Sequence, residues 1–91
     1  MTKPLIIDTR EAFEYAKSHA EGAINIPPAE FMRGEVPPEL RGVAKDAEIV
    51  VYCRSGQRSN TCSMMLREFG FSNIVNGVNE HRVAKIIQDK S

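Results

Sequence analysis

Continuous apolar runs mark two segments of the chain as buried strands. Leu5–Ile7 is a short run that turns polar at Asp8, and Glu48–Cys53 is a longer run made mostly of β-branched and aromatic residues. Runs of this length are typical of strands that are buried on both faces of a parallel sheet. We therefore predict a strand at each position, ending in a polar residue in the first case and in a cysteine in the second.

Two weaker extended segments complete the strand pattern. Ala23–Ile26 is stopped by the pair Pro27-Pro28, and Asn73–Gly77 is predicted to be a strand that ends in a turn. Glycines and a second proline pair interrupt Ala29–Asp46. We expect that segment to be a loop with one or two short helical turns.

The first helical pattern covers Glu11–His19. Phe13, Ala16 and Ala20 recur at helical spacing, which predicts that they form the face directed to the core. Gly22 follows and is expected to end the segment.

A second helical pattern begins after a polar turn, and Ser59 or Asn60 is a suitable N-cap for it. Its apolar stripe consists of Cys62, Met65, Leu66 and Phe69. Gly70 followed by Phe71 predicts a left-handed glycine after the helix, with the phenylalanine packed back on the last turn. A closing helix has Val83, Ile86 and Ile87 on its core side. We expect the methionines and phenylalanines at helical spacing to belong to the core.

Strands and helices alternate along the chain, which predicts the α/β class: a small parallel sheet with helices on both faces. The 91 residues are enough for one domain, residues 1–91, and too few for a second core. Parallel sheets bind ligands beyond the carboxyl ends of their strands. That edge is where the pattern places Asp8, Arg10 and Cys53.

Charge and composition narrow the function classes. Twelve Lys and Arg balance twelve Asp and Glu, so the chain lacks the positive field that drives nucleic acid binding. No apolar run approaches the ~20 residues that span a bilayer. We expect a soluble cytoplasmic monomer, or a periplasmic protein if a signal peptide has been removed.

The two cysteines, Cys53 and Cys62, look like free thiols. Their separation does not match the Cys-x-x-Cys redox motif, and together with His19 and His81 they do not form a zinc-finger spacing. We therefore expect no metal site.

Cys53 has the surroundings of a reactive thiolate. It is placed at a strand end, before a glycine-containing turn and a helix start, where backbone N–H groups and the helix dipole favour an anion. Arg54 and Arg58 flank the turn and add positive charge, which predicts a depressed thiol pKa. The alternative is an inert buried cysteine, since free cysteine is among the most buried residue types.

The sequence resembles the single-domain rhodanese-like sulfurtransferases, in particular the small phage-shock-type rhodaneses. One part of the resemblance is Asp8-Thr9-Arg10 at a strand end, followed by Glu14-Tyr15, His19 and Gly22–Pro27. The other part is Val51–Ser59, which looks like the active-site loop of the family. The resemblance covers nearly the whole chain.

The resemblance implies a rhodanese-like fold and a persulfide mechanism. Cys53 would accept a sulfane sulfur from a donor such as thiosulfate and pass it to cyanide, a thiol or a thioredoxin-like protein, without a cofactor. The loop residues that would contact the donor are Arg54, Ser55, Gly56, Gln57, Arg58 and Ser59. Asp8 and Arg10 would support the loop.

The chain departs from the family after the last predicted strand. A Gly-Gly pair and a nearby Trp are common there, whereas this chain has Asn76–His81 and contains no Trp. The wall of the pocket is therefore expected to differ, and with it the preference for a donor.

Two other residues have competing interpretations. His19 could be a general base, but a thiolate needs none, so we favour a capping or packing role at the end of its helix. Cys62 could be a resolving thiol that attacks an oxidised or persulfidated Cys53. Its place on the apolar stripe favours a core position instead.

Two other functions compete with sulfur transfer. A cysteine phosphatase or arsenate reductase also surrounds a thiolate with an anion loop and an arginine. Such loops are one residue longer than the four residues between Cys53 and Arg58. A non-catalytic rhodanese-like binding module is the other alternative, although such modules usually lack the cysteine.

Overall fold

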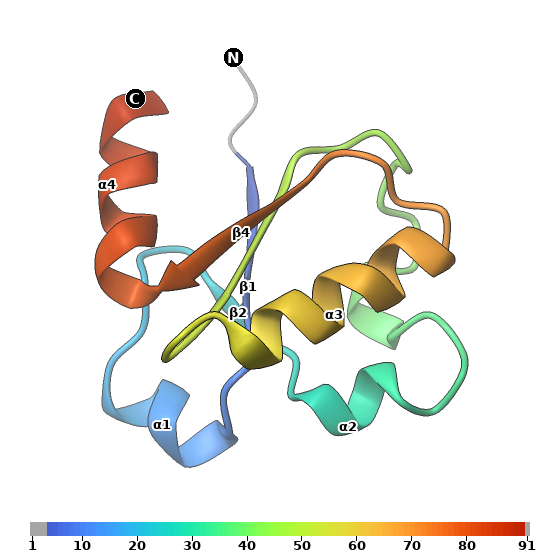
Figure 1. Ribbon diagram of the computed structural model, residues 1–91, viewed down its shortest axis with the longest axis horizontal. Coiled ribbons are helices and arrows are strands. Elements are labelled where there is room, and N and C mark those ends of the chain that lie inside the picture. The colour runs from blue at the N-terminus through green and yellow to red at the C-terminus, as the bar shows by residue number, and fades with distance from the viewer. Residues whose placement is uncertain (1–3, 91) are drawn as a thin grey trace.

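The computed structural model describes residues 4–90 (Figure 1). The strands are β1 (Leu5–Asp8), β2 (Ile24–Asn25), β3 (Ile49–Cys53) and β4 (Ile74–Asn79). The helices are α1 (Ala12–Lys17), α2 (Pro28–Phe31), α3 (Gln57–Glu68) and α4 (Glu80–Lys90), with a 3-10 turn, η1 (Pro38–Leu40). All the predicted strands are present, and the two short helical turns lie within the segment that was expected to be mostly loop.

The sheet is parallel, with strand order β2-β1-β3-β4. Its two central strands are the two continuous apolar runs, and all five residues of β3 are buried. Asp8 pairs in register with Tyr52, so the carboxyl ends of β1 and β3 lie at the same edge of the sheet. This register confirms that Asp8 and Cys53 are close to one edge.

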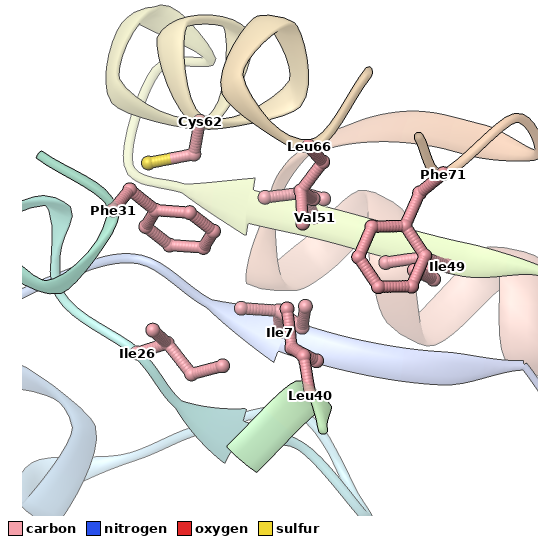
Figure 2. Packing of buried hydrophobic residues seen from close by; sticks show 9 residues of the cluster. All are labelled: Ile7, Ile26, Phe31, Leu40, Ile49, Val51, Cys62, Leu66 and Phe71. Atoms are coloured by element: carbon pink, nitrogen blue, oxygen red, sulfur yellow. The ribbon is translucent and has the colours of Figure 1, made fainter. Parts of the chain in front are cut away.

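Helices cover both faces of the sheet, as predicted (Figure 1). One face packs against α2, α3 and η1, and this cluster consists of Ile7, Ile26, Phe31, Leu40, Ile49, Val51, Cys62, Leu66 and Phe71 (Figure 2). The other face packs against α4 and the segment around α1, with Ile6, Ala20, Ala23, Val50, Tyr52 and Val83. Neighbouring residues of β1 and β3 therefore serve different clusters, because side chains alternate along a strand.

The prediction that Ser59 or Asn60 caps α3 is wrong. The helix begins at Gln57, and its N-cap is Gly56, whose φ of 94° lies in the left-handed region. Glycine adopts this conformation without steric cost, so the chain turns earlier than the polar residues suggested. Ser59 therefore lies in the first turn of α3, where its amide faces back toward the end of β3.

The end of α3 has the predicted geometry. Gly70 has a φ of 100°, and its amide donates to the carbonyl of Arg67. The amide of Phe71 donates to the carbonyl of Leu66, and the Phe71 ring is buried. These two hydrogen bonds form a Schellman motif that joins α3 to the following strand.

The predicted core face of the first helix is wrong. Phe13 is 71% exposed and Ala16 is exposed, whereas Ala20 is buried beyond the end of the helix. Tyr15 is the residue that packs inward, and its hydroxyl donates to the carbonyl of Ala23 at 2.7 Å. A helix of only six residues is positioned by this contact rather than by its apolar stripe. On α3, by contrast, Met65 and Phe69 of the predicted stripe are partly buried and pack against the core.

The predicted turn at Gly77 is also wrong, because β4 continues through it to Asn79. The pairing with β3 shifts at this point, so Gly77 is the extra residue of a β-bulge. A Cβ atom at Gly77 would lie 2.5 Å from Cγ2 of Val83 and 2.9 Å from Cγ1 of Val50. Glycine is required there because β4 and α4 approach each other closely.

Candidate active site

Cys53 lies at the carboxyl end of β3 with only 2% of its surface exposed. Two backbone amides of the following turn point at its sulfur: the N–H of Gly56 at 3.1 Å and the N–H of Ser59 at 3.4 Å. The Ser59 hydroxyl lies 3.5 Å from the same atom. The left-handed conformation of Gly56 folds the turn around the sulfur, which is thus surrounded by hydrogen-bond donors.

The hydrogen bonds determine the ionisation of Cys53. Burial would raise the pKa of the thiol, but hydrogen bonds from the Ser59 hydroxyl and from the amides of Ser59, Ser55 and Gly56 outweigh it and lower the pKa to about 7. A substantial fraction of Cys53 is therefore thiolate at neutral pH, and thiolate is the nucleophilic form. The predicted depression of the pKa is confirmed.

The predicted source of that depression is only partly right, because the two arginines of the turn pair with a carboxylate. Nη1 of Arg58 lies 3.2 Å from Oε1 of Glu14, and Nε of Arg54 lies 3.9 Å from Oε2. The Glu14 side chain is 13% exposed and comes from α1. The helix dipole and turn amides act on the sulfur directly, while the single negative charge of Glu14 offsets part of the charge of the two arginines, mainly that of Arg58.

A pocket of about 410 Å³ opens beside the sulfur. Its lining residues are Arg10, Cys53, Arg54, Asn79, Glu80 and His81. Among the residues predicted to contact the donor, only Arg54 lines this pocket. The amides of Gly56 and Ser59 contact the sulfur instead. Ser55 and Gln57 are exposed to solvent, and Arg58 points toward Glu14.

Asp8 and Arg10 form a buried pair at the end of β1. Nη2 of Arg10 lies 2.6 Å from Oδ2 of Asp8, and the same oxygen accepts a hydrogen bond from the hydroxyl of Tyr52 at 2.9 Å. The hydroxyl and amide of Thr9 both donate to the carbonyl of Tyr52 at 2.9 Å. Because Tyr52 precedes Cys53, this network fixes the backbone on the inner side of the sulfur, and Arg10 also reaches the pocket.

Glu14, Tyr52 and Asn76 belong to the site but were not assigned roles from the sequence. Asn76 hydrogen-bonds to both Gly56 and Ser59 from β4. Tyr52 is the one residue of β3 with a hydroxyl, placed in register with Asp8, and that pairing is a signal that could have identified it. Glu14 and Asn76 act across the fold and have no comparable signal in their local sequence.

The sequence matches the Rhodanese-like domain family over residues 1–79. The chain belongs to the rhodanese-like family. Among solved structures, a rhodanese with bound anions from E. coli is 30% identical, with a TM-score of 0.76, and the alignment covers 90% of this chain and 93% of that one. The human single-domain sulfurtransferase has the same fold, with a TM-score of 0.69, 22% identity and coverage of 90% and 82%.

Curated relatives are longer proteins. YrkF of Bacillus subtilis (strain 168), a candidate sulfur carrier protein by its name, is 34% identical over 73 residues, which are 80% of this chain and 37% of YrkF. The tRNA uridine(34) hydroxylase of Escherichia coli (strain K12 / DH10B) is 36% identical over 72 residues, 77% of this chain and 20% of the hydroxylase. The rhodanese-like chain therefore spans between 20% and 37% of the length of these relatives.

The departure from the family around Gly77 has a structural outcome. Gly77 fits the close approach of β4 and α4, and the next residue is Val78 with a φ of 72°. A β-branched residue rarely adopts this conformation. Cγ1 of Val78 lies 3.3 Å from the position that a Cβ atom would occupy on Gly56. The valine thus packs directly against the active-site turn of this rhodanese-like domain.

Cys62 and His19 have the positions that the sequence favoured. Cys62 is fully buried and faces Phe31 in the core (Figure 2), and burial together with the charge of Cys53 raises its pKa to about 12. The ring of His19 stacks on Tyr15 with centroids 3.8 Å apart, and its Nδ1 lies 2.8 Å from the Tyr15 carbonyl oxygen. Both cysteines are free thiols.

Within residues 4–90, no group of three or more His, Cys, Asp and Glu side chains is arranged to hold a metal ion. No helix in the same described part of the chain has the length and apolar character to cross a bilayer.

Proposed function

We propose that the protein is a sulfurtransferase that carries a sulfane sulfur as a persulfide on Cys53. The observation that carries this proposal is the environment of Cys53. The residue ends a buried strand, its sulfur accepts hydrogen bonds from the amides of Gly56 and Ser59, and it lines a pocket. A thiolate in such a position attacks an electrophilic sulfur without a separate base. The names of the E. coli rhodanese and of YrkF agree with this chemistry.

The proposed donor is thiosulfate or a related sulfane-sulfur compound. The Cys53 thiolate attacks the outer sulfur of thiosulfate, a new S–S bond forms, the original S–S bond breaks, and sulfite leaves with the electron pair. The persulfide keeps one negative charge on its outer sulfur. The turn amides and the cations of Arg10 and Arg54 at the pocket stabilise the anions on both sides of this step.

The proposed acceptor is a thiophilic anion such as cyanide, or the thiolate of a small molecule or a thioredoxin-like protein. The acceptor attacks the outer sulfur of the persulfide and removes it, and the Cys53 thiolate is restored. No redox cofactor is needed because each step exchanges one S–S or C–S bond for another. The pocket of about 410 Å³, which Cys53 helps to line, has room for a small donor or acceptor.

The geometry favours sulfur transfer over phosphatase or arsenate reductase chemistry. Those reactions require the arginine that closes the loop to contact a tetrahedral oxyanion. Here Arg58 is bound to Glu14 and does not line the pocket beside Cys53. A non-catalytic binding module is disfavoured because the pKa of Cys53 is lowered to about 7, which a purely structural cysteine does not require.

Intact mass spectrometry after incubation with thiosulfate tests the proposal. The protein and a Cys62→Ser control should each gain one sulfur atom, which cyanide removes, and a Cys53→Ser variant should gain none. Sulfur uptake by Cys53→Ser, or no uptake by the unmodified protein, would show that the proposed function is wrong. A parallel assay with an aryl phosphate separates the phosphatase alternative, which predicts hydrolysis without a stable mass gain.

A further inference from the structure

Asn76 connects β4 to the turn that surrounds Cys53. Its Oδ1 atom accepts a hydrogen bond from the Ser59 hydroxyl at 2.7 Å, and its Nδ2 atom donates to the carbonyl of Gly56 at 3.2 Å. Gly56 and Ser59 are the two residues whose amides lie 3.1 and 3.4 Å from the Cys53 sulfur. One side chain thus holds both ends of the segment that supplies these donors.

The hydroxyl of Ser59 has a single proton to donate. While Cys53 is a thiol, its S–H donates to the Ser59 oxygen at 3.5 Å and the Ser59 hydroxyl donates to Oδ1 of Asn76 at 2.7 Å, a shorter contact than its 3.2 Å contact with the carbonyl of Gly56. Once Cys53 is a thiolate, its sulfur competes with Asn76 for the hydroxyl proton. Without Asn76 the hydroxyl would turn to the thiolate more easily, but the first turn of α3 would lose its anchor on β4, and the amides of Gly56 and Ser59 would no longer be held on the sulfur.

The same amide oxygen of Asn76 also fixes a strained residue of β4. The N–H of Val78 donates to Oδ1 of Asn76 at 3.0 Å, and Val78 has a φ of 72°. This conformation is strained for a non-glycine residue and persists only where neighbouring contacts hold it. The Val78 side chain packs on Gly56, so Asn76 and Val78 both contact the turn from β4.

We propose that Asn76 is a positioning residue that holds the Gly56 and Ser59 donors against the Cys53 sulfur. This inference rests on the proposed function, in which Cys53 is the reacting thiolate. Asn76 does not line the pocket beside Cys53. It therefore acts through the turn and not on the donor. Its loss should weaken the reactivity of the sulfur while the cations that face the donor remain in place.

The charged and ionisable groups around Cys53 come from several elements. They are Arg10 at the end of β1, Arg54 and Arg58 in the turn and α3, Cys62 of α3, Glu14 of α1, and Glu80 and His81 of α4. An Asn76→Ala substitution changes none of these charges. A change in the titration of Cys53 in that variant therefore reports on the hydrogen bonds of the turn.

The test is the pH dependence of Cys53 alkylation by iodoacetamide, a neutral reagent, measured in a Cys62→Ala background. Asn76→Ala should raise the midpoint by about one pH unit, because the backbone amides of Gly56 and Ser59 that donate to the thiolate are no longer held in place, and the freed Ser59 hydroxyl compensates for only part of this loss. Sulfur uptake from thiosulfate at pH 7 should fall about five- to tenfold through kcat, with KM little changed. Asn73→Ala is the matched control, since Asn73 is an exposed asparagine just before β4 whose amide donates to the Asp46 carbonyl.

A second arm uses Ser59→Ala. If Asn76 acts through Ser59, the double variant should titrate close to the Ser59→Ala single variant rather than showing the sum of both shifts. An unchanged midpoint in Asn76→Ala, or the same shift in Asn73→Ala, would overturn the positioning role. Either result is separable from the proposed function, which fails only if the unmodified protein takes up no sulfur.

Discussion

The carboxylate of Glu14 lies 3.2 Å from the guanidinium of Arg58, although the two residues are 44 positions apart in the chain. Burial acts to raise the pKa of Glu14, but the hydrogen bond from Arg58 and the nearby Arg54 lower it overall. Glu14 is therefore an anion throughout the neutral range. It competes with an anionic donor for the cations of the active-site turn.

Glu14→Gln should accordingly increase the use of thiosulfate. A partly exposed ion pair is worth about 1 kcal/mol or less, so releasing the arginines should raise kcat/KM for thiosulfate up to about fivefold. Alkylation of Cys53 by iodoacetamide should change little, and Glu21→Gln, at an exposed position, provides the control. An equal change in both rates would mean that Glu14 acts on the Cys53 thiolate and not on donor binding.

The pKa values of the two cysteines predict how stability depends on pH. Folding lowers the pKa of Cys53 from 9.0 to about 7, so between these values the unfolded chain binds more protons and the free energy of unfolding rises with pH. The gain should be about 2 kcal/mol from pH 7 to pH 9. Above pH 9 the sign reverses, because Cys62 ionises in the unfolded chain while its folded pKa is about 12.

Urea unfolding at several pH values measures this profile. Cys53→Ser should abolish the rise up to pH 9 and keep the fall above it. Cys62→Ala should keep the rise and lose the part of the fall that begins near pH 9, while burial of the Tyr52 hydroxyl, which raises its pKa, leaves a fall above pH 10. A stability profile of Cys53→Ser that still climbs in the lower range would assign the effect to another group.

Cys62→Ala should retain most sulfur uptake and lower the free energy of unfolding by about 1 kcal/mol. The side chain is fully buried against the ring of Phe31, and trimming a small core side chain removes its packing contacts (Figure 2). Thermal unfolding and the thiosulfate assay check the two parts. Loss of uptake with an intact fold would instead support the resolving-thiol hypothesis.

Gly77→Ala should lower the free energy of unfolding by about 2 kcal/mol, because the new Cβ atom would overlap with Val83 and Val50. A Val83→Ala substitution removes the atom with the shortest approach, 2.5 Å. It should therefore cost less stability in the Gly77→Ala protein than in the unmodified one, which equilibrium unfolding of the four proteins would reveal. Additive losses would show that the bulge moves to accommodate the methyl group.

Local sequence patterns correctly predicted the elements that are marked by a long apolar run or by a characteristic residue pair. β3 was recognised from five consecutive apolar residues, and the end of α3 from the pair Gly70-Phe71. The face of α1 was wrong because six residues contain too few turns to define a stripe, and the Tyr15 hydroxyl decides the orientation instead. The start of α3 was wrong because a left-handed Gly56 took the capping position from Ser59.

The sequence predicted the parts of the site that are contiguous in the chain, but not the residues that reach the site from distant elements. Cys53 and the amides that follow it are contiguous, and Asp8 and Cys53 meet because parallel strands share an edge. Glu14 and Asn76 reach the turn from α1 and β4, and nothing near either residue in the sequence indicates a partner so far away. The contribution of Arg54 and Arg58 to the lowered pKa of Cys53 was therefore overestimated, because the sequence of the turn does not reveal their pairing with Glu14.

Because Cys62 is buried, the rate at which a reagent labels its thiol can measure transient local opening of the protein. The thiol has no exposed surface and lies between α3 and the sheet, so a maleimide can reach it only when that layer separates. Once Cys53 has been blocked by alkylation, the rate at which Cys62 is labelled counts these openings. The face covered by α4 holds no cysteine among its buried residues, so such labelling would distinguish opening of one layer from opening of the other.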